Sequence, residues 1–280
     1  MNENIQIGLS IGNSRYHWAW FLNTKLQSSW DTEYLTIVGN ASQYENRASS
    51  LFPIDLQAII KRDRLEIDRI PIYLISVVPS QTEIWQQLPQ VKQITLADIP
   101  LHNLYQTLGI DRALAAFGAG ETYGYPVLVI DGGTALTITG IDNNRRLIGG
   151  AIMPGLRLQL RSLSTGTAAL PEIILPQQLP TRWSDNTPDS IASGILHTVS
   201  AGISNFIQDW QQLYPDSQII FTGGDGDLLV GYLQAILPMD SRNRVRFVGV
   251  ASLKENRDLL FHGLSAIFVK CSEDIHKTSV

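Results

Sequence analysis

The chain has 280 residues, a formal net charge of −5 and a single cysteine, Cys271. This length allows one large or two modest domains, and the negative charge gives no general affinity for nucleic acid. One cysteine excludes an intramolecular disulfide and argues against a zinc site built on several cysteines. Because residues 1–9 lack a basic signal region and no apolar run reaches about 18 residues, we expect a cytoplasmic protein without nucleic-acid or membrane partners.

The N-terminal part is predicted to begin as a β-meander. Two strand-like runs, Ile5–Ile11 and Tyr16–Leu22, flank the hairpin signal Gly12-Asn13-Ser14-Arg15, and a third strand is expected at Ser28–Tyr34. The polar segment Gly39–Ser50 fits a helix or a loop. Further patterns predict helices at Pro53–Leu65, Pro79–Leu88 and Ala113–Tyr123, and strands at Pro71–Val78 and Val91–Leu96.

The stretch Val127–Gly155 joins a buried strand, Val127–Ile130, to a glycine turn. The strand is followed by four residues that could serve a phosphate group: Asp131, Gly132, Gly133 and Thr134. Glycines let backbone N–H groups approach a phosphate, a threonine adds a hydroxyl donor, and a carboxylate can hold a metal ion or its water. Asp-Gly-Gly is also ordinary turn chemistry. The similar strand–turn–strand unit at the N-terminus favours two related halves that bind one nucleotide.

The C-terminal part predicts alternating strands and helices. Strands are expected at Ala135–Ile141, Arg146–Ile148, Gln218–Phe221 and Val245–Val248, and helices at Pro154–Leu163, Pro188–Leu213, Asp227–Leu237 and Leu253–Lys270. Ser164–Pro180 is expected to be irregular and Cys271–Val280 to be a frayed tail. We place a domain boundary so that residues 1–122 and 123–280 form two domains, with the last helix able to pack back on the first.

Short strings along nearly the whole chain, taken together, resemble the type III pantothenate kinases. These kinases lie within the acetate and sugar kinase, heat-shock protein and actin superfamily. The matching strings are I11-GNSR-15, G109-IDRALAAFGA-119, D131-GGTALT-137, G149-GAIMPGL-156, T167-AALP-171, T222-GGD-225 and L259-LFHGL-264. Each string alone is weak evidence, and the joint match in this order is specific.

The resemblance implies an α/β fold of two ribonuclease-H-like (actin-like) domains, each a mixed β-sheet with flanking helices. It also implies ATP-dependent phosphorylation of pantothenate at its primary hydroxyl, the first step towards coenzyme A. The implied cofactors are Mg²⁺ with ATP and a monovalent cation, K⁺ or NH₄⁺. The implied assembly is a homodimer whose active site draws on both subunits.

For the substrate side, the resemblance implies that Asp111 is the general base and that Arg112 binds the pantothenate carboxylate. The residues alone favour Asp111 as the N-cap of its helix, and an exposed position at the helix start is the commoner one for an arginine such as Arg112. Gly109 and Tyr105 are expected beside the substrate, although Tyr105 could serve packing alone. Thr167 resembles a threonine that touches pantothenate, with an ordinary loop hydroxyl as the alternative. Gly155 would begin a helix whose N–H groups shape the pocket.

For the nucleotide side, the resemblance assigns residues of three glycine-containing loops. The expected ATP-binding residues are Ser10, Gly12, Asn13, Ser14, Arg15, Gly132, Gly133, Thr134, Gly223 and Gly224, and the expected metal residue is Asp131. Gly223 and Gly224 would let the adenosine lie against the backbone, with an ordinary strand-to-helix turn as the alternative.

The chain departs from the family pattern at Ser10, where the first loop normally begins with aspartate. Serine keeps a hydroxyl but removes a carboxylate that helps to hold Mg²⁺ and its waters. We expect retained activity, because Asp111, Arg112, Asp131 and the glycine loops are present. A second hypothesis is a non-catalytic nucleotide- or pantothenate-binding regulator on the same fold. A third is a kinase for another small hydroxy acid, since Arg112 indicates only that an anion is bound.

Overall fold

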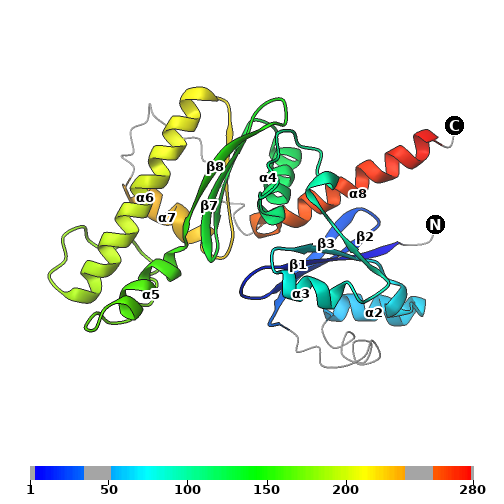
Figure 1. Cartoon of the computed structure of the whole chain (residues 1–280), viewed down its shortest axis with the longest axis horizontal. Coiled ribbons are helices and arrows are strands. Elements are labelled where there is room, and N and C mark those ends of the chain that lie inside the picture. The colour runs from blue at the N-terminus through cyan, green and yellow to red at the C-terminus, as the bar shows by residue number, and fades with distance from the viewer. Residues whose placement is uncertain (1–3, 35–51, 237–254, 279–280) are drawn as a thin grey trace. The chain divides into compact units, whose positions relative to one another are not determined.

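Two sheets with the same strand pattern form the framework of the chain (Figure 1). The computed structural model describes residues 4–34, 52–236 and 255–278. Internal contacts divide the chain into a first unit, Met1–Pro100, Tyr105–Gly118 and Leu260–Val280, and a second unit, Leu101–Leu104 and Ala119–Leu259. The domain limits expected from the sequence, 1–122 and 123–280, stay predictions, because these units are defined by contacts and not by independent folding.

The first unit holds a five-stranded sheet in the order β3-β2-β1-β4-β5. Its strands are β1 (Ile5–Ile11), β2 (Tyr16–Leu22), β3 (Lys25–Thr32), β4 (Ile72–Ser76) and β5 (Val91–Gln93). The helical elements of this part are α2 (Ile54–Asp63), η1 (Ile67–Arg69), α3 (Pro79–Trp85), η2 (Leu96–Asp98), α4 (Ile110–Tyr123) and α8 (Leu259–Thr278). β1, β2 and β3 form an antiparallel meander, and β4 lies parallel to β1 on its other side.

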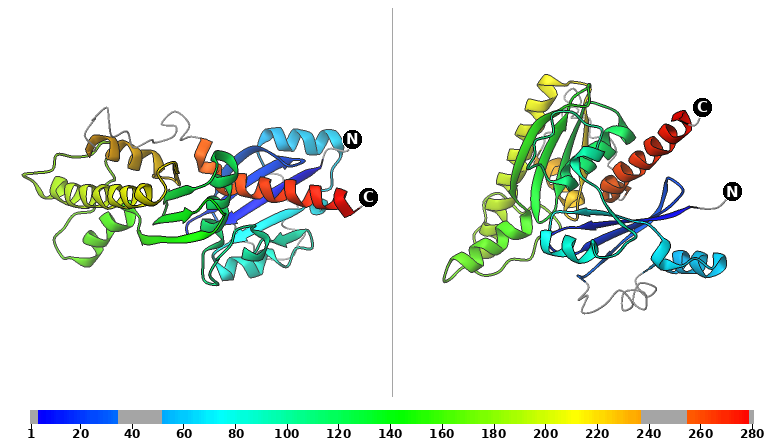
Figure 2. Two further views of the ribbon diagram at one scale, coloured as in Figure 1. Left: turned by 90° about the horizontal axis from the view of Figure 1, so that it is seen from above. Right: turned by 45° about the vertical axis from the view of Figure 1, so that its right-hand side comes forward.

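Helices cover both faces of this sheet (Figure 1 and Figure 2). Side chains alternate between the faces of a strand, so the odd-numbered apolar residues of β1 enter one core with Leu56 of α2 and Trp85 of α3. The opposite face packs against α8, where a Cβ on Gly8 would lie 2.9 Å from Leu264 Cδ2. Phe21 of β2 meets Phe268 of α8 at a ring-centroid distance of 5.2 Å. The continuous burial of β1 follows from this double cover.

The second unit repeats the strand pattern of the first in a four-stranded sheet, β8-β7-β6-β9. Its strands are β6 (Val127–Gly132), β7 (Ala135–Ile141), β8 (Leu147–Pro154) and β9 (Gln218–Thr222), and its helical elements are α5 (Leu156–Gly166), α6 (Thr187–Leu213), α7 (Gly226–Ile236) and η3 (Glu255–Asp258). Again the first three strands are antiparallel, and the fourth, β9, lies parallel to β6. α5, α6 and α7 lie along one face and share a core with β6 and β7 (Figure 1).

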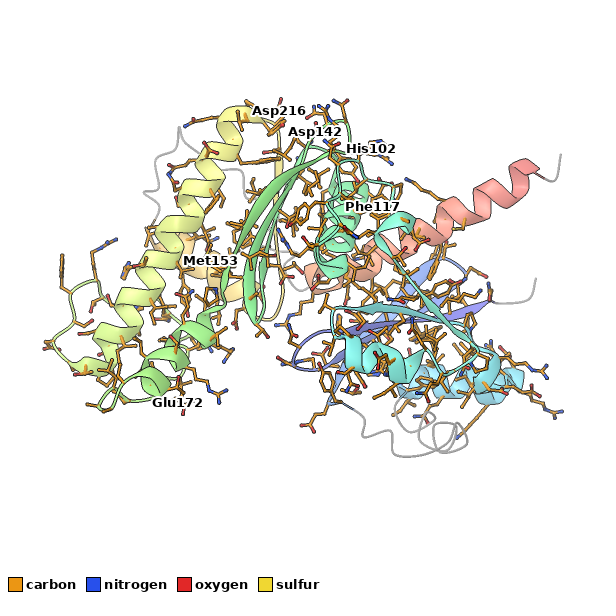
Figure 3. The ribbon with its side chains drawn as sticks, in the orientation of Figure 1. His102, Phe117, Asp142, Met153, Glu172 and Asp216 are labelled. Atoms are coloured by element: carbon orange, nitrogen blue, oxygen red, sulfur yellow. The ribbon has the colours of Figure 1, made fainter. Side chains whose placement is uncertain are left out.

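One turn of the second sheet is held by Asp142, which Figure 3 labels between β7 and β8. Its carboxylate accepts hydrogen bonds from the backbone N–H of Asn144 at 2.8 Å and of Arg146 at 2.9 Å. Burial opposes the charge, but the hydrogen bonds from Arg146 and Asn144 lower the pKa of Asp142 overall. The carboxylate therefore stabilises the hairpin that the sequence predicts here.

The structure confirms several predicted limits and corrects others. β1, β2 and β7 have the predicted ends, whereas the third strand begins at Lys25 and not at Ser28. β8 continues to Pro154, so the glycine pair after Ile148 is strand and the next helix begins at Leu156. The predicted frayed tail is wrong, because α8 continues to Thr278. The strand expected at 245–248, the segment 39–50 and the start of the last helix at 253 lie outside the described residues.

We predict that Gly263→Ala destabilises the first unit. A Cβ at this position of α8 would overlap the backbone carbonyl oxygen of Leu114 in α4. It would also lie 3.0 Å from the Cδ1 atom of the Leu114 side chain. Overpacking of this kind costs about 1–3 kcal/mol in the free energy of unfolding, measurable by urea denaturation. Gly194→Ala, on an exposed turn of α6 with no atom near the new Cβ, should instead raise it by about 0.5–1 kcal/mol. Equal denaturation midpoints for the two variants would refute the close packing of α8.

Candidate functional site

Three loops of the second unit meet around Asp131, the penultimate residue of β6. Gly223, after β9, has a φ of +82°, and a Cβ there would overlap Asp131 Oδ1 and lie 2.8 Å from the backbone of Gly132. The backbone N–H of Asp225 donates to the carbonyl oxygen of Gly132 at 2.8 Å. The turn after β9 and the turn after β6 are therefore in direct backbone contact.

The start of α5 closes the same group of loops. Gly155 is the N-cap of this helix, and its N–H donates to the carbonyl oxygen of Thr134 at 2.9 Å. A Cβ on Gly155 would overlap the carbonyl oxygen of Gly133 and lie 2.7 Å from that of Thr134. The structure thus brings together all the residues of the second unit that the sequence singled out for phosphate, metal and adenosine, with Gly155 beside them: Asp131, Gly132, Gly133, Thr134, Gly223 and Gly224.

A charged pair that the sequence reasoning missed braces these loops. Asp225, only 4% exposed, precedes α7 and accepts the N–H of Leu229 through its backbone carbonyl. Its Oδ1 atom accepts from Arg157 at 3.2 Å for Nε and 3.0 Å for Nη2. The two residues are 68 positions apart, so no local pattern could have paired them, although Asp225 ends one string that carries the resemblance and Arg157 directly follows another.

In the first unit, four predicted residues gather at the start of α4. The Oδ1 atom of Asp111 accepts the N–H of Arg112 at 2.8 Å, and a Cβ on Gly109 would lie 2.5 Å from that oxygen. α4 begins at Ile110, so Asp111 lies in the first turn and not at the cap position. Burial raises the pKa of Asp111, and the hydrogen bond and charge of Arg112 only partly oppose it. Arg112 is buried, and its Nη1 donates to the Tyr105 hydroxyl at 3.3 Å.

The first loop joins β1 to β2 in the same unit. Ser10 is buried at the penultimate position of β1, opposite His17 of β2. The N–H of Gly12 donates to the carbonyl oxygen of Arg15 at 3.3 Å and closes the turn, and Asn13, Ser14 and Arg15 are exposed. The turn therefore presents polar groups to solvent, as a phosphate loop requires.

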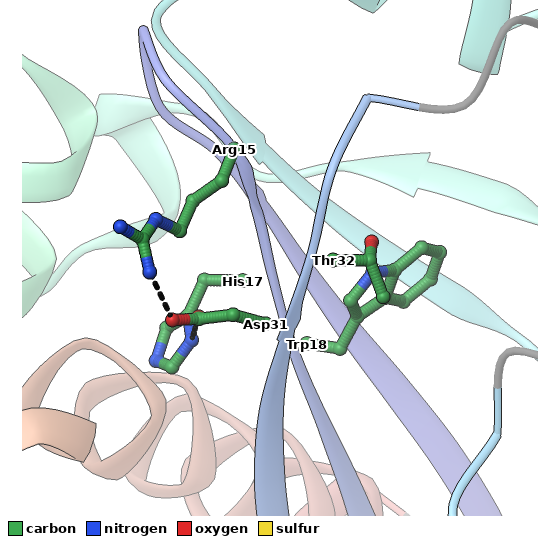
Figure 4. A network of polar contacts seen from close by, with 5 residues as sticks. All are labelled: Arg15, His17, Trp18, Asp31 and Thr32. Atoms are coloured by element: carbon green, nitrogen blue, oxygen red, sulfur yellow. Dashed lines mark hydrogen bonds and ion pairs between the residues drawn. The ribbon is translucent and has the colours of Figure 1, made fainter.

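Arg15 and His17 share one carboxylate, that of Asp31 on β3 (Figure 4). Arg15 Nη1 lies 2.8 Å from Asp31 Oδ2, and His17 Nδ1 lies 2.6 Å from Asp31 Oδ1. The hydrogen bond to His17, followed by the contacts with Arg15, lowers the pKa of Asp31 to about 2 against a desolvation effect of opposite sign. Asp31 therefore remains ionised at neutral pH.

Thr167 is not brought to the other predicted residues of the second unit. It is the C-cap of α5, and 11 helical residues separate it from Gly155 at the N-cap, which is roughly 16 Å along the axis. Its hydroxyl donates to the carbonyl oxygen of Leu163 at 2.8 Å and accepts the N–H of Leu170 at 3.3 Å. Within one chain, Thr167 therefore has a local capping role.

The acidic residues of the loops suit a metal ion that is held mainly by a substrate. Among the described residues, no group of three or more His, Cys, Asp or Glu side chains could enclose a metal. Mg²⁺ is commonly bound by one or two carboxylates, several waters and the phosphates of a nucleotide. Asp131, surrounded by glycine backbone, fits that mode. Among helices of the described part, none is long and apolar enough to cross a membrane.

Comparisons with known proteins agree with this architecture. A model of the type III pantothenate kinase family matches residues 7–209. A type III pantothenate kinase from Synechocystis sp. is 42% identical over 93% of this chain and 89% of its own length. One from Nostoc sp. is also 42% identical, over 84% of this chain and 87% of its own length. A structure described as a Baf-family transcriptional activator from Campylobacter jejuni has a TM-score of 0.57 at 20% identity, covering 95% of this chain and 99% of its own.

A second solved structure shares the fold at lower identity. The activator of 2-hydroxyisocaproyl-CoA dehydratase from Clostridium difficile, with bound ADPNP, has a TM-score of 0.51 at 12% identity and covers 98% of this chain and 97% of its own. The repeated sheets and their glycine loops define an α/β protein of the actin-like class, with two ribonuclease-H-like halves. Within that class, the family model and the curated relatives show that the chain belongs to the type III pantothenate kinase family.

We predict that Gly223→Ala lowers the thermal stability of the second unit, whereas Gly224→Ala does not. The first variant forces a side chain into positive φ and against Asp131, with an expected cost of about 1–3 kcal/mol. At Gly224 a new Cβ meets no atom within 4 Å. Differential scanning calorimetry of the two variants tests this difference. If both variants unfold at the same temperature as the unchanged chain, the loops do not approach Asp131 as closely as described.

Proposed function

We propose that this chain transfers the γ-phosphoryl group of ATP to the primary hydroxyl of pantothenate, the first step towards coenzyme A. The observation that carries the proposal is the position of the Asp111 carboxylate beside the buried Arg112, where burial raises the pKa of Asp111 above its usual range. Membership of the type III pantothenate kinase family supports the choice of substrate. Phosphoryl transfer depends mainly on positioning and charge neutralisation, which suits a site made of loops and charged side chains.

On the substrate side, Asp111 acts as the general base. Its raised pKa gives the carboxylate a higher affinity for a proton, so it can accept the hydroxyl proton as the oxygen attacks phosphorus. Arg112 pairs with the pantothenate carboxylate, and Tyr105, whose hydroxyl it contacts, lines the same place. Because Gly109 has no Cβ atom, the Asp111 carboxylate can lie against it.

On the nucleotide side, the glycine loops bind ATP. Gly132, Gly133 and Thr134 contact phosphates from one loop, and Ser10, Gly12, Asn13, Ser14 and Arg15 contribute from the other, while Gly223 and Gly224 lie against the adenosine. Asp131 holds Mg²⁺, directly or through water. Mg²⁺ neutralises charge on the phosphates during transfer. The requirement for K⁺ or NH₄⁺ is part of the proposal and rests on the family resemblance.

We further propose that the enzyme is a homodimer in which Thr167 serves the partner's substrate. The capping position of Thr167, far from Gly155 along α5, favours a role outside its own site. Exposed apolar side chains on β8 and α5 would be covered by a second copy: Ile148 is 49%, Ile152 65% and Leu158 46% exposed. A cytoplasmic location remains a prediction from the sequence.

Two alternatives lead to different results in a turnover assay. A binding regulator would form no ADP with pantothenate, and a kinase for another hydroxy acid would respond to that acid instead. The assay is coupled ADP release with ATP, Mg²⁺ and K⁺ or NH₄⁺, with and without pantothenate. Turnover only with pantothenate supports the kinase. Activity that appears only in Ser10→Asp would favour the regulator, because it would mean that the natural first loop has lost catalysis.

We predict that Asp111→Asn lowers kcat by roughly 10²–10⁴-fold while ATP binding persists, because the amide cannot accept the proton. In the natural chain, kcat/KM should fall as the pH is lowered through the raised pKa of Asp111, since protonation of its carboxylate removes the base. Steady-state rates across a pH series measure both effects. The matched control is Asp55→Asn, an exposed aspartate in the first turn of α2, which should retain full turnover. An active Asp111→Asn enzyme would exclude Asp111 as the base.

A further inference from the structure

A row of polar side chains crosses the first sheet beside the first loop. Ser10 of β1 is the register partner of His17 of β2, which is in turn the partner of Asp31 of β3. Directly opposite residues on neighbouring strands project from the same face, so the three side chains form a continuous row. Ser10 brings no charge to this row, and the only carboxylate in it is that of Asp31.

The two equivalent strands β1 and β6 differ in the charge of their penultimate residue. Asp131 is the penultimate residue of β6, and Ser10 is the penultimate residue of β1, in the equivalent place of the equivalent strand. The second loop therefore carries an anion where the first loop carries a neutral hydroxyl. Arg15, at the end of the first turn, brings a cation instead.

Asp31 uses both carboxylate oxygens to hold Arg15 and His17, the residues before and after Tyr16. One oxygen contacts Arg15 at 2.8 Å and the other contacts His17 at 2.6 Å (Figure 4). His17 is also fixed by α8, since its ring lies against Phe261 with centroids 4.7 Å apart. The Arg15 side chain is 63% exposed and thus accessible to a ligand while Asp31 holds it.

Such an arrangement has little value for stability alone. An exposed ion pair contributes little to the free energy of unfolding, because water screens the charges and two side chains lose freedom. Orientation has a larger effect on binding, since a guanidinium that is already held towards a phosphate loses less entropy when it binds one.

We infer that Asp31 is a positioning residue that aims Arg15 at the phosphates of ATP, with His17 fixing the carboxylate from the other side. The inference rests on the proposed function only in taking ATP as the ligand of the first loop. The negative charge of the phosphates would then be neutralised at the first loop by the Arg15 cation, and at the second loop by a Mg²⁺ ion that Asp131 would hold.

The test measures ATP affinity by titration calorimetry and KM for ATP and for pantothenate by ADP release. Arg15→Gln and Asp31→Asn should each weaken ATP binding by roughly tenfold, the effect of one charged hydrogen bond, and leave KM for pantothenate unchanged. The double variant should bind ATP no more weakly than Arg15→Gln alone, because Asp31 acts through Arg15. Asp31→Glu should recover part of the affinity.

A matched control is available in the same unit. Asp63→Asn removes the carboxylate of another exposed Arg–Asp pair, Arg62 with Asp63 at 2.7 Å, and should leave KM for ATP unchanged. The inference is overturned if Asp31→Asn binds ATP as the natural chain does, if the two single effects are additive, or if the natural chain binds no ATP. Calorimetry without pantothenate tests the role of Asp31 in ATP binding even if the enzyme shows no turnover. A chain that binds ATP in this way but forms no ADP would contradict the proposed reaction and not this inference.

Discussion

Close backbone contact around one carboxylate is the constraint on which the second unit depends. The segments that begin at Asp131, Gly155 and Gly223 come from distant parts of the sequence, and a single added Cβ at either glycine would separate them. Backbone groups vary less in position than long side chains, so a loop cluster of this kind is pre-organised for a polyanion. In the proposed nucleotide site, the glycines of these loops would therefore act through their backbone groups.

The repeated sheet shows how one topology can support two different charge arrangements. In both sheets an antiparallel meander is followed by a strand parallel to the first, which places a turn at the end of β1 and at the end of β6. The turn after β6 follows an aspartate, and the turn after β1 follows a buried serine. Because phosphates can be neutralised by a cationic side chain or through a metal held by a carboxylate, the loss of one carboxylate need not abolish binding.

Local sequence signals predicted the elements that local interactions determine. β1, β2 and β7 were found at their exact limits because alternating apolar residues end at turn residues. β8 was predicted too short, since Gly149 and Gly150 have low strand propensity and only their pairing with β7 makes them strand. The start of β3 was missed because the preceding turn places Asn23 at positive φ, without a glycine to mark it. Without that turn the register of β3 is undefined, so Asp31 could not be placed opposite His17.

The candidate site includes two aspartates of the first unit whose environments separate their chemistry. Asp31 receives hydrogen bonds from His17 and Arg15 that hold its pKa at about 2, so it stays an anion and can only position cations. Burial raises the pKa of Asp111, and the hydrogen bond and charge of Arg112 compensate for this rise only in part. These opposite pKa shifts agree with the roles proposed for the two residues, a fixed charge at Asp31 and a proton acceptor at Asp111. The resemblance singled out Asp111 from the sequence, whereas the contacts of Asp31 with Arg15 and His17 are visible only in the structure.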